Sequence, residues 1–202
     1  MIFEIEKIKG LYIIPNVFND EEHNFYMEKL KNDSCNKCPQ IHMANEHGWK
    51  FIPVRENGLI LKRTRDDYLG FPDWMDNLKL HTIRKLKQFL TRDFNINHVL
   101  INKYEIDDGC HDHIDELEFW TDFIIGVSFG SSTVMKFSND KSIIDVNIPK
   151  NSIYVMTGDV RYNWTHGIDF QKSDNIYGKI RDRDIRISVT FREIKKEYLP
   201  CE

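Results

Sequence analysis

The chain has 202 residues and a mass of 24.1 kDa, which is enough for one domain with its own hydrophobic core. Hydrophobic residues make up 41% and aromatic residues 12% of the sequence, and this excludes a disordered chain. A net charge of −4 and a pI near 6.1 exclude a global positive field that would attract nucleic acid non-specifically. Three local basic clusters remain available for a polyanion: Lys62–Arg65, Arg84–Lys87 and Lys179–Arg183.

The sequence contains no apolar run of the length that a membrane span requires. Its first residues include acidic side chains where a signal peptide would have a basic and then an apolar region. We therefore expect a soluble intracellular protein of the cytoplasm or nucleus.

Four cysteines are too few and too irregularly spaced to form a disulfide framework in a chain of this length. Cys35 and Cys38 are followed by His42 and His47, but the two pairs lie closer together than the ligand pairs of a structural zinc finger. We expect a surface loop here, and the sequence leaves open whether Cys35 and Cys38 bind a metal.

The first half of the chain predicts two helices with short strands around them. The apolar run Leu11–Ile14 stops at a proline and is expected to be a strand. Asn19 or Asp20 can cap a helix whose first turn is acidic and which is expected to end by Asp33. Gly70–Asp73 is expected to open a second helix, whose apolar face consists of Met75, Leu78, Ile83, Leu86 and Leu90.

The segment between these helices divides into a polar part and a part with strand character. We expect the irregular stretch that contains the cysteines and ends at Gly48 to be a loop. Trp49–Leu61 is expected to form one or two short strands, and Glu56–Gly58 can make a hairpin turn between them.

From residue 98 onward the pattern changes to short strands separated by turns. The expected strands are 98–106, 121–130, 133–138, 143–148, 152–156, 162–168 and 185–194. Seven strands at this spacing predict a sandwich or barrel. Because helices come first and strands follow, we expect an α+β fold with a double-sheet core. The chain is expected to be one domain, 1–202, with an N-terminal helical region at 1–97 and a β core at 98–194.

The stretch Asn102–Asp115 contains groups that bind metals. His113 and Asp115 are separated by one residue, so on an extended backbone they project to the same face and can bind one ion side by side. A histidine and a carboxylate are two of the three ligands in the 2-His-1-carboxylate triad, which holds Fe(II) and leaves coordination positions open. A polar loop with a solvated histidine would explain the same residues, so this pair needs support from elsewhere in the chain.

Two downstream segments supply that support. His166 lies far beyond Asp115 in the sequence, and a β-barrel can bring such a distant strand across its interior. In Arg186–Arg192 polar and apolar residues alternate, so the two arginines share a face with Ser188 and Thr190. An exposed surface strand would alternate in the same way, but beside a metal triad a guanidinium can hold a dicarboxylate bidentately.

Together these segments resemble the AlkB-like Fe(II)/2-oxoglutarate dioxygenases. The resemblance runs from about Asn102 to Arg192, and its specificity comes from several elements in the right order and spacing. These elements are Asn102-x-Tyr104, His113-x-Asp115, the segment Gly158-Asp-x-Arg-Tyr-x-Trp-Thr-His166-Gly-Ile168, and Arg186-x5-Arg192. The resemblance implies a double-stranded β-helix, or jelly-roll, whose N-terminal region covers the site as a lid and helps to recognise the substrate.

The resemblance also implies the site residues. The implied ligands of Fe(II) are His113, Asp115 and His166. Arg186 is similar to the arginine that pairs with the distal carboxylate of 2-oxoglutarate. The other implied contacts to this cosubstrate are Asn102, Tyr104 and Arg192.

Two neighbours of His113 have alternative interpretations. His111 would share a strand face with His113 and competes with it for the ligand role. The spacing from Tyr104 and the following Asp115 favour His113, so we expect His111 to be a neighbour of the site or solvated. Cys110 is expected to be a small buried apolar residue.

The implied reaction uses O2 to oxidise 2-oxoglutarate to succinate and CO2, and it hydroxylates a C–H bond of the prime substrate. When that bond belongs to an N-methyl group, formaldehyde is lost and the substrate is demethylated. Family members that repair alkylated bases have an acidic residue two positions after the metal aspartate, where this chain has Leu117. The segments Met156–Ile168 and Asp122–Ser131 are most similar to the branch that acts on wobble uridines of tRNA.

We therefore expect a modified nucleic acid as the substrate, with a tRNA wobble-type base favoured. Arg161 and Trp164 either contact a substrate base or have structural roles, the arginine at a turn and the tryptophan in the core. Members of the favoured branch often carry RNA-binding and methyltransferase domains that 202 residues cannot hold. A basic cluster or a partner protein would then deliver the substrate, and the polar connection Asp169–Asp184 could close over the site.

Other functions remain open alternatives. They are repair of alkylated DNA or RNA bases, hydroxylation or demethylation of protein side chains, and a catalytically idle jelly-roll that only binds. Since all three implied metal ligands and Arg186 are present, the idle module is the least favoured. The oligomeric state cannot be predicted from these residues.

Overall fold

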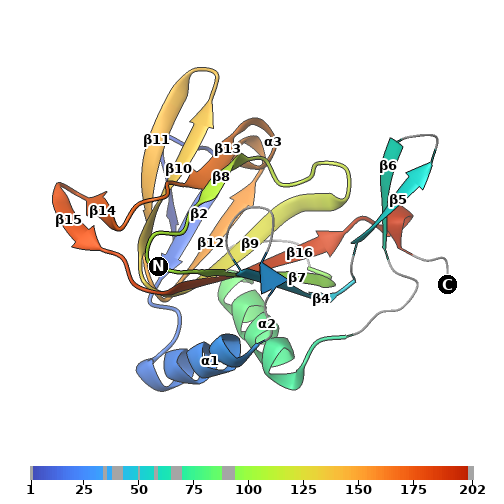
Figure 1. The fold of residues 1–202 in the computed structure, drawn as a ribbon, viewed down its shortest axis with the longest axis horizontal. Coiled ribbons are helices and arrows are strands. Elements are labelled where there is room, and N and C mark those ends of the chain that lie inside the picture. The colour runs from blue at the N-terminus through green and yellow to red at the C-terminus, as the bar shows by residue number, and fades with distance from the viewer. Residues whose placement is uncertain are drawn as a thin grey trace.

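The computed structural model describes residues 2–33, 36–37, 43–49, 51–56, 59–64, 70–87 and 94–199. Its centre consists of two antiparallel β-sheets, which we call the major and minor sheets (Figure 1). In spatial order the major sheet comprises β1 (Phe3–Glu4), β2 (Leu11–Pro15), β12 (Ser152–Thr157), β9 (Trp120–Gly130), β16 (Arg186–Ile194), β7 (His98–Tyr104), β4 (Met43–Gly48) and β3 (Asn36–Lys37). The minor sheet comprises β11 (Ser142–Ile148), β10 (Thr133–Asn139), β13 (Thr165–Ile168) and β8 (Cys110–His113).

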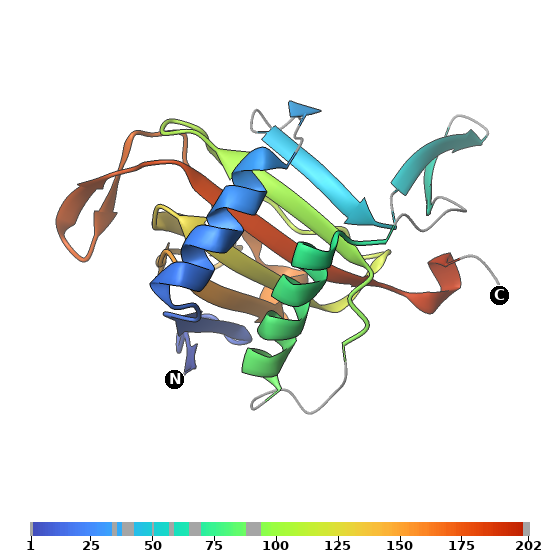
Figure 2. The ribbon, with the colours of Figure 1, turned by 90° about the horizontal axis from the view of Figure 1, so that it is seen from below.

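Two helices, α1 (Asp20–Asn32) and α2 (Asp73–Leu86), cover one face of the major sheet (Figure 2). Asn19 caps α1 by accepting from the backbone N–H of Glu22, while the Glu22 side chain accepts from the backbone N–H of Asn19. On the helix side the first hydrophobic core includes Phe18, Tyr26, Leu30, Met75, Leu78 and Leu86. On the sheet side it includes Val99, Ile101, Val127, Phe129, Ile187, Val189 and Phe191.

The opposite face of the major sheet encloses a second hydrophobic core with the minor sheet. Tyr104, Ile124 and Tyr154 from the major sheet belong to it, together with Met135 and Phe137 from the minor sheet. Because successive side chains of a strand point to opposite faces, strands β7, β9 and β16 each contribute to both layers. The molecule is thus a layer of helices on two facing sheets, which confirms the expected jelly-roll core with few helices.

Most elements lie where the sequence predicts them. The strand expected at Leu11–Ile14 is β2, the first helix is capped by Asn19 and ends before Asp33, and the second begins directly after Pro72. The strand pair expected around Glu56–Gly58 is β5 (Phe51–Glu56) with β6 (Leu59–Thr64). Residues 88–93, which include the expected helical Leu90, lie outside the described residues, as do Cys35, Cys38, His42 and the side chains of Lys62–Arg65.

Three expectations were wrong. The loop expected up to Gly48 contains β4, which pairs with β7 through backbone groups, so its polar sequence carried no strand signal. The strand expected at 162–168 begins only at Thr165, because a short helix, α3 (Asp159–Asn163), precedes it. The strand β8 was missed because its four residues include three polar side chains.

The connection expected at Asp169–Asp184 is a hairpin of β14 (Ser173–Ile176) and β15 (Lys179–Asp182), which projects from the body of the molecule in Figure 1. Arg183 fixes its base through a bidentate pair with Asp174, in which both side chains are buried. Arg183 also donates to the backbone carbonyls of Asp108 and Asp169. Arg183 thus anchors the base of this hairpin, and closure of the segment over the site stays a prediction.

The predicted boundary at residue 97 remains a prediction, although β1 to β4 of the N-terminal region belong to the major sheet. Among the described residues, no helix has the length and hydrophobicity needed to cross a membrane.

Candidate active site

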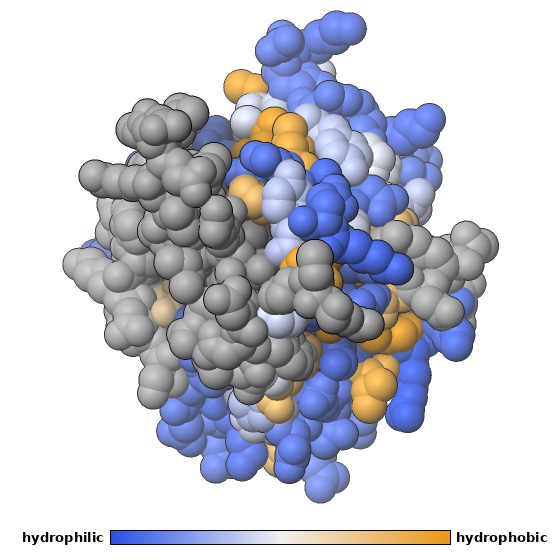
Figure 3. All heavy atoms as spheres, turned by 90° about the vertical axis from the view of Figure 1, so that its right-hand side faces the viewer, coloured by the Kyte–Doolittle hydropathy of each residue, from blue (hydrophilic) through white to orange (hydrophobic). Residues whose placement is uncertain are grey.

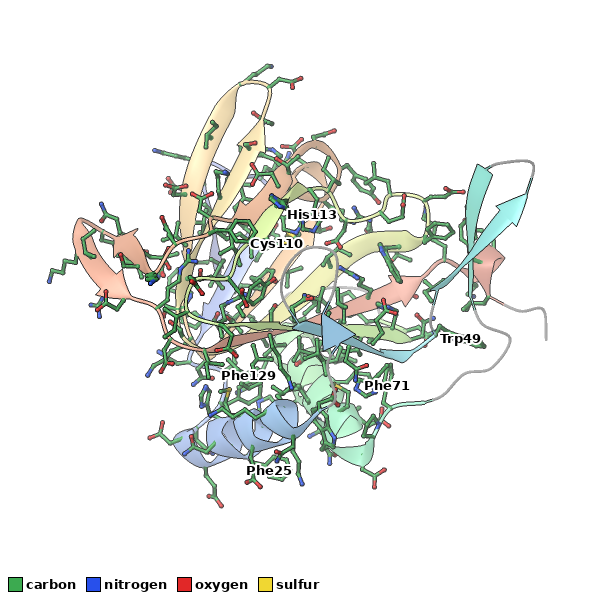
Figure 4. All side chains as sticks on the ribbon, viewed as in Figure 1. Phe25, Trp49, Phe71, Cys110, His113 and Phe129 are labelled. Carbon is green, nitrogen blue, oxygen red and sulfur yellow. The ribbon has the colours of Figure 1, made fainter. Side chains whose placement is uncertain are left out.

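The three predicted metal ligands meet at the minor sheet. Strand β8 ends at His113, and β13 lies beside it with His166 directly opposite His113. The centroids of the two imidazole rings are 4.5 Å apart. Asp115 follows β8 by two residues, and its Oδ2 lies 3.8 Å from Nε2 of His166. In Figure 4, His113 and Cys110 lie on the side of the major sheet away from the helices, whereas Phe129 lies on the helix side.

Both histidines have a feature that suits a metal ligand. Nδ1 of His113 lies 2.8 Å from the backbone carbonyl of His111. A carbonyl only accepts hydrogen bonds, so Nδ1 carries a proton and Nε2 is the nitrogen that would bind a metal. Burial lowers the pKa of His166 to about 4, so this imidazole is neutral at pH 7.

Asp115 is a buried carboxylate with a strong cationic partner. Its Oδ1 is paired with Nη2 of Arg192 from β16. Burial alone would raise the pKa of Asp115, but Arg192, followed by His166, His113 and Arg161, holds this pKa below its usual value. Asp115 is therefore ionised at neutral pH, as a metal ligand must be.

Arg161 and Trp164, predicted as substrate contacts or structural residues, are both buried. Arg161 donates from Nη1 to the carbonyl of Asp115 and from Nη2 to the carbonyl of Glu116, each at 2.8 Å. The indole Nε1 of Trp164 donates to the carboxylate of Asp159 at 2.9 Å. These contacts place Arg161 behind the chain that carries Asp115, where it positions that carboxylate. A contact of either residue with substrate stays a prediction.

The predicted cosubstrate residues come from the adjacent strands β7 and β16. Arg186 is opposite Tyr104 and Ser188 is opposite Asn102 in the strand register. The guanidinium of Arg186 lies 5.2 Å from the centroid of the Tyr104 ring, and its Nε donates to Ser128 Oγ at 3.1 Å. Among the described residues, Nη1 and Nη2 of Arg186 are buried without a hydrogen-bond partner. Two unsatisfied cationic donors at one buried position fit a bound carboxylate.

The residue types at the site, two histidines and one carboxylate, suit Fe(II). Two ligands that each lie about 2.1 Å from one ion can be separated by up to about 4 Å, so the 3.8 Å between Asp115 and His166 is compatible with a shared ion. Among the described residues, however, no group of three His, Cys, Asp and Glu side chains has its donor atoms arranged to hold a metal ion. Arg192 contacts Asp115 directly, so small side-chain adjustments would accompany metal binding.

The two neighbours of His113 are placed as expected. His111 is exposed, and its ring packs 5.0 Å from the ring of Phe170. Cys110 is a buried thiol whose Sγ lies 3.8 Å from Nδ1 of His113.

Two residues next to this site were missed from the sequence. Ser128 accepts from Arg186, and the available signal was a serine within the apolar run Phe123–Phe129. Tyr154 packs across Gly126, where an added Cβ would come within 2.0 Å of its ring. This close approach brings the Tyr154 hydroxyl to 3.3 Å from Ser188 Oγ, so the glycine is required for the contact.

Comparison with known proteins identifies relatives along most of the chain. The model of the 2OG-Fe(II) oxygenase superfamily matches residues 10–192. The tRNA (carboxymethyluridine(34)-5-O)-methyltransferase ALKBH8 of Mus musculus is 34% identical over 215 residues, which span 95% of this chain and 31% of that protein. The DNA N6-methyl adenine demethylase of Caenorhabditis elegans is 24% identical over 199 residues, spanning 95% of this chain and 62% of that protein.

Among solved structures, that of OsALKBH1 superposes with a TM-score of 0.60 at 15% identity, covering 91% of this chain and 96% of that one. This likeness concerns the fold alone. The family match covers nearly the whole chain, including every predicted metal ligand and Arg186. The chain therefore belongs to the 2OG-Fe(II) oxygenase superfamily, with AlkB-like proteins among its relatives in both sequence and fold.

Proposed function

We propose that this chain uses Fe(II), 2-oxoglutarate and O2 to hydroxylate or oxidatively demethylate a modified nucleic acid, with a tRNA wobble-type base as the favoured substrate. The observation that carries the chemistry is the meeting of His113, Asp115 and His166 at the minor sheet, where Asp115 pairs with Arg192 of β16, the strand that also carries Arg186.

Each residue has a defined task in this proposal. The imidazoles of His113 and His166 and the ionised carboxylate of Asp115 would hold Fe(II), which when bound activates O2. Arg186 would fix the distal carboxylate of 2-oxoglutarate, with Asn102 and Tyr104 as further contacts. Arg192 keeps Asp115 ionised, and Arg161 holds the backbone of Asp115 and Glu116 in place. These contacts of Arg161 and Arg192 help to hold Asp115 in the position that the reaction requires.

Relatives support a nucleic-acid substrate. The mouse relative is named for tRNA and the nematode relative for DNA. Position 117, acidic in base-repair enzymes, is a half-exposed leucine whose backbone carbonyl accepts from Nζ of Lys195. Figure 3 shows that the described part of the molecular face on the right of Figure 1 is mainly hydrophilic, with hydrophobic residues in small separate groups. A polar substrate suits such a surface better than a large apolar partner does.

The similarity to the nematode protein favours a modified DNA base as the second candidate. Protein side chains and a catalytically idle binding module follow, and delivery of the substrate by a partner protein belongs to the same proposal.

The chemistry can be tested apart from the substrate. Wild-type protein mixed anaerobically with Fe(II) and 2-oxoglutarate should develop a weak visible charge-transfer band, and succinate should form when air is admitted. His113→Ala should lose both signals, whereas His111→Ala, which changes the exposed neighbour, should keep them. If the wild-type protein bound neither Fe(II) nor 2-oxoglutarate, the proposed dioxygenase activity would be refuted.

The substrate can be identified by nucleoside mass spectrometry. Transfer RNA and oligonucleotides with N-methylated bases are incubated with wild-type protein and with His113→Ala, and their nucleosides are compared. A hydroxylated wobble uridine that forms only with wild-type protein is the expected result. Loss of N6-methyladenine from DNA would favour the second candidate, and unchanged nucleosides with continuing succinate production would point to a protein substrate.

A further inference from the structure

A cavity lies where β7 and β16 of the major sheet approach the turn that joins β9 to β10. It contains about 220 Å³ of empty space, including its opening to solvent. Arg186 and Tyr104 line it from the major sheet, and Thr133 and Ile168 line it from the minor sheet. The turn residues Ser131 and Ser132 complete this side of the cavity.

The guanidinium of Arg186 leaves two donors unsatisfied at this cavity. Its Nε donates to Ser128, but within the described residues neither Nη1 nor Nη2 has a partner, and the residue is 3% exposed. A buried cation with two unsatisfied donors is costly until an anion occupies the adjacent space.

Thr133, the first residue of β10, adds a neutral donor to the same cavity. It is 2% exposed, and among the described residues its Oγ1 has no hydrogen-bond partner. The two preceding hydroxyls are engaged, because Ser131 Oγ donates to the carbonyl of Ser132 and Ser132 Oγ accepts from the backbone N–H of Lys150. A buried hydroxyl without a partner calls for a specific explanation, and Thr133 lines the same cavity as Arg186.

We propose that Thr133 is a cosubstrate-binding residue, whose Oγ1 donates to the same carboxylate as the guanidinium of Arg186. The ligand would be a 2-oxo dicarboxylate, held at its distal end by one charged and one neutral donor. This inference rests on the proposed function, because it assumes that Arg186 receives the distal carboxylate of 2-oxoglutarate. It adds a residue of the minor sheet to a set that otherwise comes from the major sheet.

Removal of this one hydroxyl tests the assignment. Thr133→Val deletes the donor with little change in volume, and Thr133→Ser keeps it. Thr82→Val is the matched control, since Thr82 is a buried threonine in α2 whose hydroxyl donates to Leu78 within its own helix. Each protein is loaded anaerobically with Fe(II) and titrated with 2-oxoglutarate and with 2-oxobutyrate, which lacks the distal carboxylate. Calorimetry measures the dissociation constants.

We expect Thr133→Val to weaken binding of 2-oxoglutarate by roughly tenfold, the loss that follows from one hydrogen bond to a charged group. Binding of 2-oxobutyrate should stay within about twofold of wild type, because it offers no carboxylate to this hydroxyl. Thr133→Ser and Thr82→Val should bind both ligands like wild type. Metal-free Thr133→Val should melt no lower than wild type, since the change removes an unsatisfied buried donor.

Other results would contradict the role of Thr133 or the proposed function itself. Equal affinity of wild type and Thr133→Val for 2-oxoglutarate would overturn the assignment. The same conclusion follows if both ligands are weakened equally, or if Thr133→Ser loses as much affinity as Thr133→Val. A wild-type protein that binds Fe(II) but no 2-oxoglutarate would instead overturn the proposed function, and the role of Thr133 with it.

Discussion

The two faces of strand β16 are both buried, yet they have opposite chemistry. Ile187, Val189 and Phe191 pack under α1 and α2 in the first hydrophobic core. Arg186 and Arg192, on the other face, point into the space between the sheets. A strand with this alternation would be half-exposed in most antiparallel sheets, because buried charges are costly without partners. Here the minor sheet covers the polar face and supplies those partners.

The two faces therefore have different tasks. The apolar face gains free energy from burial and fixes the helices on the sheet. The polar face gains little from burial, but Arg192 pairs with Asp115, and Arg186 has two donors without a partner among the described residues. Changes on the apolar face should reduce stability without altering the site, and changes on the polar face should alter both.

Phe191→Ala should cause the largest loss of stability. Phe191 is fully buried, and truncating such a phenylalanine costs about 4 kcal/mol through lost burial and the remaining cavity. Urea denaturation measures the change in the free energy of unfolding. Phe25→Ala is the matched control: Phe25 is 46% exposed, so its truncation should cost less than about 1 kcal/mol. If the folded variant lost Fe(II) binding, the separation of the two faces would be wrong.

Arg192→Met should have the next largest effect, with about 3 kcal/mol lost, because it leaves the buried carboxylate of Asp115 unpaired. The double variant Asp115→Asn/Arg192→Met should regain part of this loss in the metal-free protein, since no buried charge is left without a partner. Urea denaturation of the single and double variants checks this coupling. Simple addition of the two single effects would mean that the pair does not interact.

The pH dependence of the metal-free protein should report on His166. Its pKa is about 4 in the folded protein and near 6.5 in the unfolded chain, so the unfolded state binds a proton first as the pH falls. The free energy of unfolding should therefore fall by about 2 kcal/mol between pH 6.5 and 4.5. His166→Gln should reduce this slope but not abolish it, since burial also lowers the pKa values of His98 and His23. An unchanged slope in the variant would contradict the assignment to His166.

Asn19→Ala should have the smallest effect, about 1 kcal/mol, because it removes the side-chain cap of α1. This helix lies on the apolar face, so the affinity for 2-oxoglutarate should remain that of wild type. Asn19→Asp keeps an acceptor at the cap and should restore most of the stability. Thermal denaturation and a 2-oxoglutarate titration of both variants measure the two quantities.

The predicted elements differ in how well local sequence defined them. The start of helix α1 was predicted because residues 19 to 22 form its capping box. Strands β9 and β16 were predicted because each carries enough apolar residues to show its period. Strand β4 was not predicted, because its sequence is mostly polar and its pairing with β7 depends on backbone groups that any sequence offers.

The same distinction applies to the site. His113, Asp115, His166, Arg186 and Arg192 were predicted because they belong to motifs with fixed spacing. Arg161 was also predicted, with a contact to substrate and a structural role as alternatives, and in the structure it donates to two backbone carbonyls. Ser128 and Thr133 carry no motif, and their relation to Arg186 appears only once the sheets face each other.

The sequence by itself determined the family, the three implied metal ligands and the alternation of β16, because these depend on residue type and spacing along the chain. Only the tertiary structure decided that both faces of β16 are buried, that Arg192 pairs with Asp115, and that Thr133, whose hydroxyl has no partner among the described residues, shares a cavity with Arg186. The physical reason is that burial and pairing are properties of surfaces brought together from distant parts of the chain, and local sequence does not specify which surfaces meet.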